Sequence, residues 1–401
     1  MKIQNLAGGG GRLEAVDCLR GIAIVTVLLS HILLICYHRP ELPWNGMFRS
    51  FKVEISYLCF LPISCGVVGV AIFFVVSGFC IHSSYQSVKS WKAFYNRRFF
   101  RIYPLYFVVL IAASFWCLSF PSPYQFLTHL FLVHNYSPAT FFAINGPFWS
   151  LAIEVQLYLI YPILLFLVQR FGWKKTMILV AGLETTIRET PRLMEILGQG
   201  NPSGNWIWLL QVSPFGFWCS WSLGAYVADG YLNGKKMPLE KAPLGFWLVL
   251  AVGSYFFYPL QNCMFLLISI VTAIILTHLL KGTISFQSAP VSFKKWLSIS
   301  GEWSYSLYLI HYPLLLYLCF SFTALVVWPM GLDFYDQLLC PPNINHYNLL
   351  KVAIGLLTLP VIYGISAACY RFVEKPGIAL GKKLFTKQTP TVYQHHIPDS
   401  P

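Results

Sequence analysis

The sequence predicts an all-α membrane protein, a polytopic transmembrane helix bundle of about ten spans with its N- and C-termini in the cytoplasm. Of the 401 residues, 56% are hydrophobic and only 11% are charged, whereas soluble globular proteins carry about 25% charged residues. The apolar residues also form blocks long enough to cross a hydrocarbon core of about 30 Å, which takes about 20 helical residues. These features exclude a soluble enzyme built from one or two ordinary domains.

Apolar blocks bounded by charged residues, glycine or proline predict the individual spans. They cover residues 19–37, 66–84, 102–120, 148–168, 176–187, 205–228, 244–259, 263–280, 304–327 and 348–369. The fifth span is weak, because it is short and contains Glu184. We retain it because ten crossings place most lysines and arginines, including the C-terminal cluster, on the cytoplasmic side, as the positive-inside rule requires.

The net charge of +13 is interpreted as this topology signal and not as a nucleic-acid-binding surface. The cysteines show no paired spacing, which predicts neither a disulfide framework nor a metal site. No small-residue cleavage site follows the first apolar run, so we expect an uncleaved first span. The membrane domain is expected over residues 1–385, followed by a short polar, disordered cytoplasmic tail over 386–401.

Ionisable residues within hydrocarbon are costly, and they mark candidate active sites or transport pathways. His31 stands on the first span, eleven residues after Arg20, and Asp17 lies one turn before Arg20 as its expected ion partner. Arg20 is expected at the cytoplasmic boundary and His31 about 17 Å deeper. An imidazole at that depth is either a catalytic group or a histidine that is hydrogen-bonded to a neighbouring helix.

A carboxylate lies on the fourth predicted span, in the sequence NGPFWSLAIEVQLYLIYP. Ser150, Glu154 and Tyr158 recur at intervals of four residues and therefore share one helix face. Counting from the outer helix ends places Glu154 at a depth of about 10 Å and His31 at about 9 Å. These matching depths predict that Glu154 orients His31 as a general base.

Three arginines, Arg97, Arg98 and Arg101, enter the third span among aromatic residues in the sequence FYNRRFFRIYP. Guanidinium groups bind phosphates and aromatic faces can stack on a purine, so this cluster could hold a nucleotide-containing donor. The alternative is a cationic anchor that fixes the helix at the membrane surface. The cluster taken alone favours the anchor, because nearly every membrane protein has one.

A second histidine, His311, lies in the sequence SGEWSYSLYLIHYP, about 12 Å from the inner surface. It shares a helix face with Ser304 and Tyr308, and it either lines a route between the two membrane faces or makes a helix–helix contact. The residues that could support the site or line such a pathway are Asp17, Ser150, Tyr158, Tyr305 and His311.

Six stretches follow one another along most of the chain: VDCLRGIAIVTVLLSH, GVAIFFVVSGFCI, NRRFFRIYP, WSLAIEVQLYLIYP, SYSLYLIHYP and YRFVEKP. In this order they resemble the motifs of the acyltransferase-3 family of bacterial integral-membrane O-acyltransferases. The resemblance implies that His31 is essential and that Glu154 belongs to the site. It also implies that Arg20, Arg98 and Arg101 serve the use of acyl-CoA.

The resemblance further implies a multi-pass enzyme of the inner (plasma) membrane that moves an acyl group, expected to be acetyl, onto a hydroxyl. The donor would be cytoplasmic acetyl-CoA or another acyl-CoA, with no metal. The acceptor would be a cell-surface or exported carbohydrate, or a lipid-linked glycan. Some family members carry an extracytoplasmic esterase-like domain that is not seen in this sequence, so the membrane domain is expected to complete the transfer.

We expect the acceptor to enter from the outer side, where the loop at 329–347 and the region of His129 and His134 could shape a mouth. The alternative function is a polytopic secondary transporter with a buried His/Glu pair. Many such transporters are built from internal repeats, and no repeat is visible in this sequence.

Overall fold

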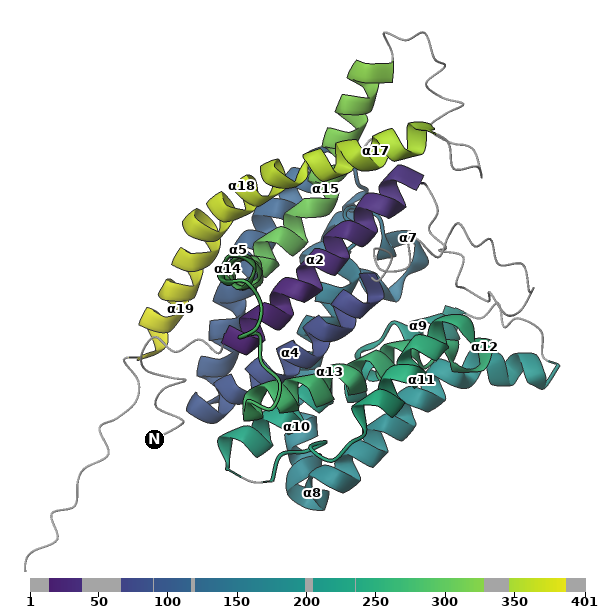
Figure 1. The fold of residues 1–401 in the computed structure, drawn as a ribbon, viewed down its shortest axis with the longest axis vertical. Helices are drawn as coiled ribbons and strands as arrows, with labels where there is room; N and C mark the ends of the chain where they lie inside the picture. Colours follow the sequence, from purple (N-terminus) through teal and green to yellow (C-terminus); the bar gives the residue numbers. More distant parts are fainter. Residues whose placement is uncertain are drawn as a thin grey trace, which may run out of the picture.

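A computed structural model describes residues 14–37, 66–88, 90–116, 120–198, 205–234, 236–327 and 346–386. Throughout these ranges the regular structure is helical, with no strand (Figure 1). Six of the described helices are long and apolar enough to cross a membrane. The all-helical membrane fold is confirmed, whereas the ten crossings and the cytoplasmic placement of both termini stay predictions. The predicted tail lies outside the described residues, apart from Thr386.

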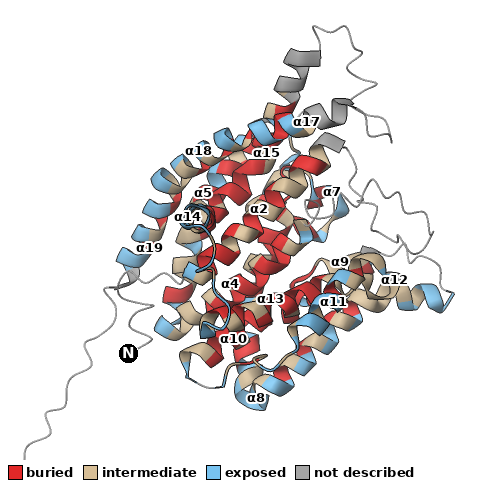
Figure 2. Ribbon diagram, viewed as in Figure 1, coloured by how far each residue is buried: buried red, intermediate tan, exposed pale blue. Residues whose placement is uncertain are grey.

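The centre of the bundle is formed by helices from both halves of the chain, and the buried residues concentrate on them (Figure 2). These helices are α2 (Glu14–Tyr37), α4 (Gly66–Val88), α10 (Trp218–Leu232) and α13 (Met264–Lys281). Two further helices, α5 (Trp91–Trp116) and α15 (Ser304–Val327), pack beside them. This arrangement brings α2, α5 and α15 together, although they are far apart in the sequence.

The fourth and fifth predicted spans form one helical run, α8 (Phe148–Ile196), which is bent at Gly172, where φ is 77°. The second half is longer than the sequence indicated, because the carboxylate of Glu184 is satisfied within the protein. It accepts hydrogen bonds from the backbone N–H (3.0 Å) and the hydroxyl (2.6 Å) of Ser220, and it pairs with Arg188 at 3.2 Å. A buried charge with such partners does not interrupt a helix.

Several predicted spans are divided into shorter helices, and proline stands at or near the first position of three of the segments that follow a break. These three are η3 (Pro214–Phe217), α12 (Tyr258–Gln261) and α18 (Leu359–Cys369). Their neighbours are α9 (Asn205–Gln211), α11 (Leu244–Phe256), α17 (His346–Leu357), η5 (Tyr370–Glu374) and α19 (Lys375–Thr386). Besides η5 and α19, which follow the last predicted span, four short elements fall outside the predicted spans: α6 (Pro123–Leu130), η2 (His134–Tyr136), α7 (Pro138–Phe141) and α14 (Val291–Glu302).

Helices α4 and α10 touch backbone to backbone through two glycines. A Cβ atom on Gly224 would collide with the carbonyl oxygen of Val75, and one on Gly78 with the carbonyl oxygen of Trp221. Small residues allow the same close approach in other membrane helix pairs. We therefore expect Gly224→Ala to lower the melting temperature in detergent by an amount that reflects about 1–3 kcal/mol of overpacking.

The matched control is Gly253→Ala on α11, where an added Cβ would meet no atom within 4 Å. This variant should melt at or above the wild-type temperature, because alanine has the higher helix propensity. Equal melting temperatures for the two variants would contradict the contact between α4 and α10.

Candidate active site

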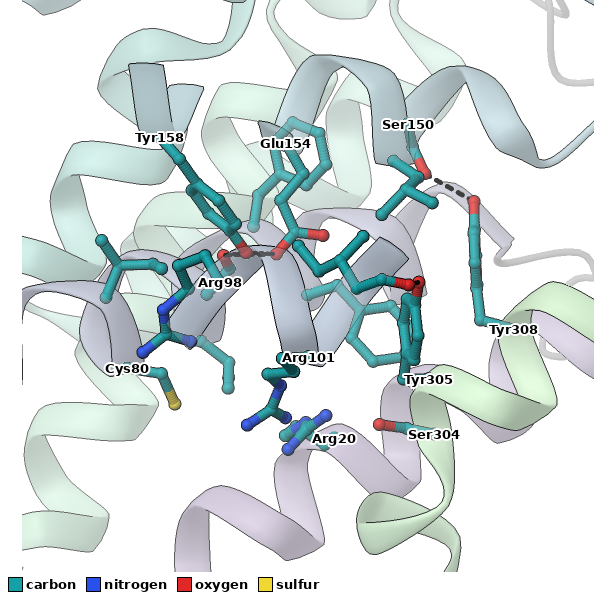
Figure 3. A pocket seen from close by; sticks show the side chains of 17 residues that line it. Arg20, Cys80, Arg98, Arg101, Ser150, Glu154, Tyr158, Ser304, Tyr305 and Tyr308 are labelled. Carbon is teal, nitrogen blue, oxygen red and sulfur yellow. Dashed lines mark hydrogen bonds between the residues drawn. The ribbon is translucent and has the colours of Figure 1, made fainter. Parts of the chain in front are cut away.

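A cavity of about 90 Å³ lies between α2, α4, α5, α8 and α15. Figure 3 shows Arg20, Arg98 and Arg101 on one side of it, and Ser150 with Tyr308 on the other. The remaining apolar lining comes from α4, α5 and α8: Phe73, Phe74, Val76, Ile81, Ile102 and Leu151. The cavity thus has a cationic end and an apolar end.

Three guanidinium groups from two helices face the cationic end: Arg20 from α2, and Arg98 and Arg101 from α5 (Figure 3). Within the described part of the chain, no carboxylate makes an ion-pair contact with any of them. The Nε atom of Arg98 is buried and has no hydrogen-bond partner there. Three positive charges close together in a buried site repel one another, and a bound anion would stabilise them. Arg98 and Arg101 thus line a buried cavity, and their choice between a donor site and a membrane anchor stays a prediction.

Arg97, which we had grouped with these residues, does not line the cavity. Asp17 is buried, and it stabilises the charge of Arg20 by Coulomb attraction together with Glu374. The hydroxyl of Tyr305 donates to the carbonyl oxygen of Ile102 at 2.6 Å, which fixes α15 to α5 beside the arginines. Asp17 and Tyr305 thus support the cationic end of the cavity.

The carboxylate of Glu154 also lines the cavity, and two hydroxyl groups hold it in place. Ser77 on α4 donates to it at 2.5 Å, and Tyr158 donates from one turn further along α8 (Figure 3). The indole N–H of Trp221 donates to the Ser77 hydroxyl at 3.3 Å. Ser77 and Trp221 were not predicted, although Ser77 lies inside one of the six stretches.

His31 forms a hydrogen-bonded pair with His311. The Nδ1 atom of His31 lies 3.0 Å from the carbonyl oxygen of Val27 and 3.1 Å from Nε2 of His311. Nδ1 of His311 lies within 3.0 Å of the carbonyl oxygens of Leu307 and Tyr308. Carbonyl oxygens only accept, so these contacts assign a proton to Nδ1 of both rings. Nε2 of His311 then accepts from His31, and no described residue hydrogen-bonds Nε2 of His31, which keeps its lone pair.

The predicted pairing of His31 with Glu154 is wrong, because the hydrogen-bond partners of His31 are Val27 and His311. Ser150 hydrogen-bonds Tyr308 at 2.5 Å, which places the first turn of α8 beside the second turn of α15. From that level His311 and Glu154 each lie about one turn away, in opposite directions along the bundle. By helical rise, the two predicted partners differ in depth by about 10 Å.

The depth prediction failed because α8 begins inside the bundle and not at its outer end. The preceding segment, residues 120–147, is folded inward and holds the start of α8. The side-chain amides of Asn135 and Gln156 bond each other reciprocally at 3.2 and 2.7 Å. The amide of Asn145 donates to the carbonyl oxygen of Leu309 at 3.0 Å. Counting residues from the start of α8 therefore places Glu154 too near the end of the bundle.

His129 and His134, which we expected near an outer mouth, are fully buried. Their rings are stacked, with centroids 3.9 Å apart and planes inclined by 5°. Burial lowers the pKa of His129 to about 4 and the pKa of His134 to about 3, so both rings are neutral near pH 7. These imidazoles do not form the surface of a mouth. Of the loop at 329–347, which we also expected to shape the mouth, residues 329–345 lie outside the described residues.

The fold and the cavity define a multi-pass membrane protein with a polar site enclosed by its helices. A family model for an acyltransferase domain matches residues 13–370, and the chain belongs to this family, the acyltransferase-3 family. The resemblance inferred from the six stretches is confirmed.

Three curated proteins are similar to the chain. Acyltransferase MdmB of Streptomyces mycarofaciens is 26% identical over 186 residues, which are 44% of this chain and 45% of that protein. Peptidoglycan O-acetyltransferase OatA of Listeria monocytogenes is 29% identical over 204 residues, 44% of this chain and 30% of that protein. Nodulation protein 10 of Rhizobium leguminosarum is 26% identical over 195 residues, which are 43% of this chain and 49% of that protein.

The chain spans less than half the length of each of these relatives. No solved structure matches it.

Proposed function

We propose that the chain is an inner-membrane O-acyltransferase that moves an acyl group from cytoplasmic acyl-CoA to a hydroxyl of a carbohydrate acceptor at the outer side. The observation that carries this proposal is that three guanidinium groups, from two helices, face one buried cavity. Membership of the acyltransferase-3 family supports the reaction class. The name of the relative from Listeria supports acetyl as the group and a glycan as the acceptor.

In this proposal the phosphates of the donor bind at the cationic end of the cavity. Guanidinium groups form charge-assisted, frequently bidentate hydrogen bonds with phosphate oxygens. The carboxylate of Glu154 lines the same cavity. Because a carboxylate repels phosphate, the uncharged acyl end of the donor, and not its phosphates, is placed beside Glu154. Along α2 the histidine lies about 17 Å from Arg20, and the extended thioester arm of the donor would span this distance.

The chemistry is assigned to the free lone pair on Nε2 of His31. This atom takes the proton of the acceptor hydroxyl, the alkoxide attacks the thioester carbonyl, and the carbon–sulfur bond breaks. The proton then passes from His31 to the departing thiolate. His311 stabilises the imidazolium by accepting from Nδ1–H of His31. The same lone pair would serve a transient acyl-histidine, so both routes remain within the proposal.

A comparison of surface glycans tests this function. The parent strain, a deletion strain, and the deletion strain carrying either the wild-type chain or an Arg98→Ala, Arg101→Ala variant are compared by mass spectrometry. The expected result is one acyl-sized mass difference that only the wild-type chain restores. Identical glycans in all four strains, together with solute uptake by proteoliposomes that lack an acyl donor, would instead favour the transporter.

His311 is assigned as the positioning residue for His31, and two substitutions test this role. His311→Leu removes a hydrogen bond to a developing cation, which is worth about 1.5–3 kcal/mol, so kcat should fall about 10- to 100-fold. The KM for the donor should not change, because His311 does not line the cavity. His311→Gln offers a side-chain oxygen as the acceptor and should restore part of kcat. Equal losses in the two variants would contradict the positioning role.

A further inference from the structure

Two aromatic rings line the apolar end of the cavity. Phe73 of α4 and Tyr308 of α15 both line the cavity, and their ring centroids lie 5.9 Å apart in an edge-on arrangement. Phe73 lies seven residues before Cys80, which lines the cavity near the arginines (Figure 3). Phe73 therefore stands about 10 Å from the cationic end, measured along α4. We call Phe73 and Tyr308 together the aromatic wall.

Hydrogen bonds hold the tyrosine of this wall in place. The hydroxyl of Tyr308 donates to the carbonyl oxygen of Pro147 at 2.7 Å. Because that bond uses its single proton, the Ser150 hydroxyl is the donor in the 2.5 Å bond between Ser150 and Tyr308. The ring is also almost entirely buried. The tyrosine half of the aromatic wall is thus held in place, whereas Phe73 is half-buried.

The histidine pair lies directly behind the aromatic wall. The ring centroids of Tyr308 and His311 are 5.8 Å apart, and neither His31 nor His311 lines the cavity. A donor that is held by its phosphates at the arginines points its acyl end towards this wall. The acyl group therefore meets Phe73 and Tyr308 immediately before it reaches the catalytic imidazole.

We propose that Phe73 and Tyr308 form the acyl-binding site and restrict the donor to short acyl groups. This inference rests on the proposed function and assigns the residues that select its donor. The whole cavity, its cationic end included, offers about 90 Å³, so the space beside Phe73 and the anchored tyrosine is smaller still. A methylene that does not fit such a pocket changes kcat/KM by about 10- to 200-fold. Transfer should therefore fall steeply from acetyl to butyryl donors.

The test is a series of acetyl-, propionyl-, butyryl- and hexanoyl-CoA with the full-length protein in nanodiscs. The wild type is expected to lose at least about tenfold in kcat/KM between acetyl and butyryl. Phe73→Ala removes half of the wall and should raise the ratio of butyryl to acetyl transfer by about tenfold. Phe73→Leu should raise the ratio of butyryl to acetyl transfer by a smaller factor. It replaces the alanine variant in this test if that variant does not fold.

The matched control is Phe265→Leu on α13. Phe265 is buried and packs against Phe74, but it does not line the cavity. This variant should keep the wild-type order of donors. A change of donor preference that is as large as the change in Phe73→Ala would overturn the proposal.

Binding of CoA without an acyl group separates this inference from the proposed function. CoA should bind the wild type and Phe73→Ala equally, because the phosphates contact the other end of the cavity. Both proteins could bind CoA and transfer acetyl, yet show the same dependence of kcat/KM on acyl chain length. In that case the aromatic wall does not select the donor, and the proposed function still stands. If the wild type neither binds CoA nor transfers acetyl, both proposals fail.

Discussion

Replacing His31 by alanine is expected to abolish acyl transfer, with kcat lowered by about 10²- to 10⁴-fold or more. The substitution removes Nε2 of His31, the ring nitrogen to which the proposal assigns the base, because Nδ1 of His31 is occupied by Val27 and His311. Neither the arginines nor the aromatic wall is altered, so donor binding should persist. The measurement is transfer of labelled acetyl from acetyl-CoA by purified protein, together with the affinity for CoA.

A histidine on another helix provides the control for this variant. His278 near the end of α13 is half-buried and hydrogen-bonds Thr283 at 2.8 Å, away from the cavity. His278→Ala should transfer acetyl at the wild-type rate. Full activity in His31→Ala, with membrane insertion and melting temperature unchanged, would remove His31 from the mechanism.

The double variant Arg98→Ala, Arg101→Ala is expected to raise the KM for acyl-CoA by about 10²- to 10⁴-fold. Each charge-assisted hydrogen bond to a phosphate contributes about 1.5–3 kcal/mol, and both guanidiniums face the cavity. Arg98→Lys should have an intermediate KM, because it keeps the charge but loses the planar fork. The KM is obtained from initial rates over a range of donor concentrations at one ionic strength.

Arg170→Ala is the matched control, since Arg170 is exposed on α8 and lies against Phe171. It removes a positive charge from the same protein without touching the cavity, so the KM should stay at the wild-type value. An unchanged KM in the double variant would return Arg98 and Arg101 to the role of a membrane anchor.

The helices themselves could be predicted well from the sequence, because apolar blocks of membrane length have few alternative structures. The three arginines could be identified one by one, since charge at a helix end is visible in the sequence. Their convergence could not be predicted. It depends on α2 and α5 both packing against α4 and α15 in the bundle, and no periodicity within either helix encodes those neighbours.

The partner of His31 was missed for a related reason. Depth counted from the end of a helix assumes that every helix begins at the membrane surface. Asn135, Gln156 and Asn145 bind the start of α8 within the bundle, which moves Glu154 inward and leaves His311 level with His31. The sequence did contain a relevant indication, because His311 is itself a buried ionisable residue. The sequence could not show that His311 lies beside His31, because the register between α2 and α15 cannot be inferred from it.

Transfer across a sealed membrane tests the central claim most directly. Proteoliposomes enclose membrane-impermeant saccharides, including peptidoglycan fragments, and receive labelled acetyl-CoA only from outside. The account predicts acetylated saccharide in the lumen and free CoA outside, and neither product with the Arg98→Ala, Arg101→Ala variant. Acetylation that occurs only when donor and saccharide share one compartment would contradict a donor cavity that connects to the acceptor through the bundle.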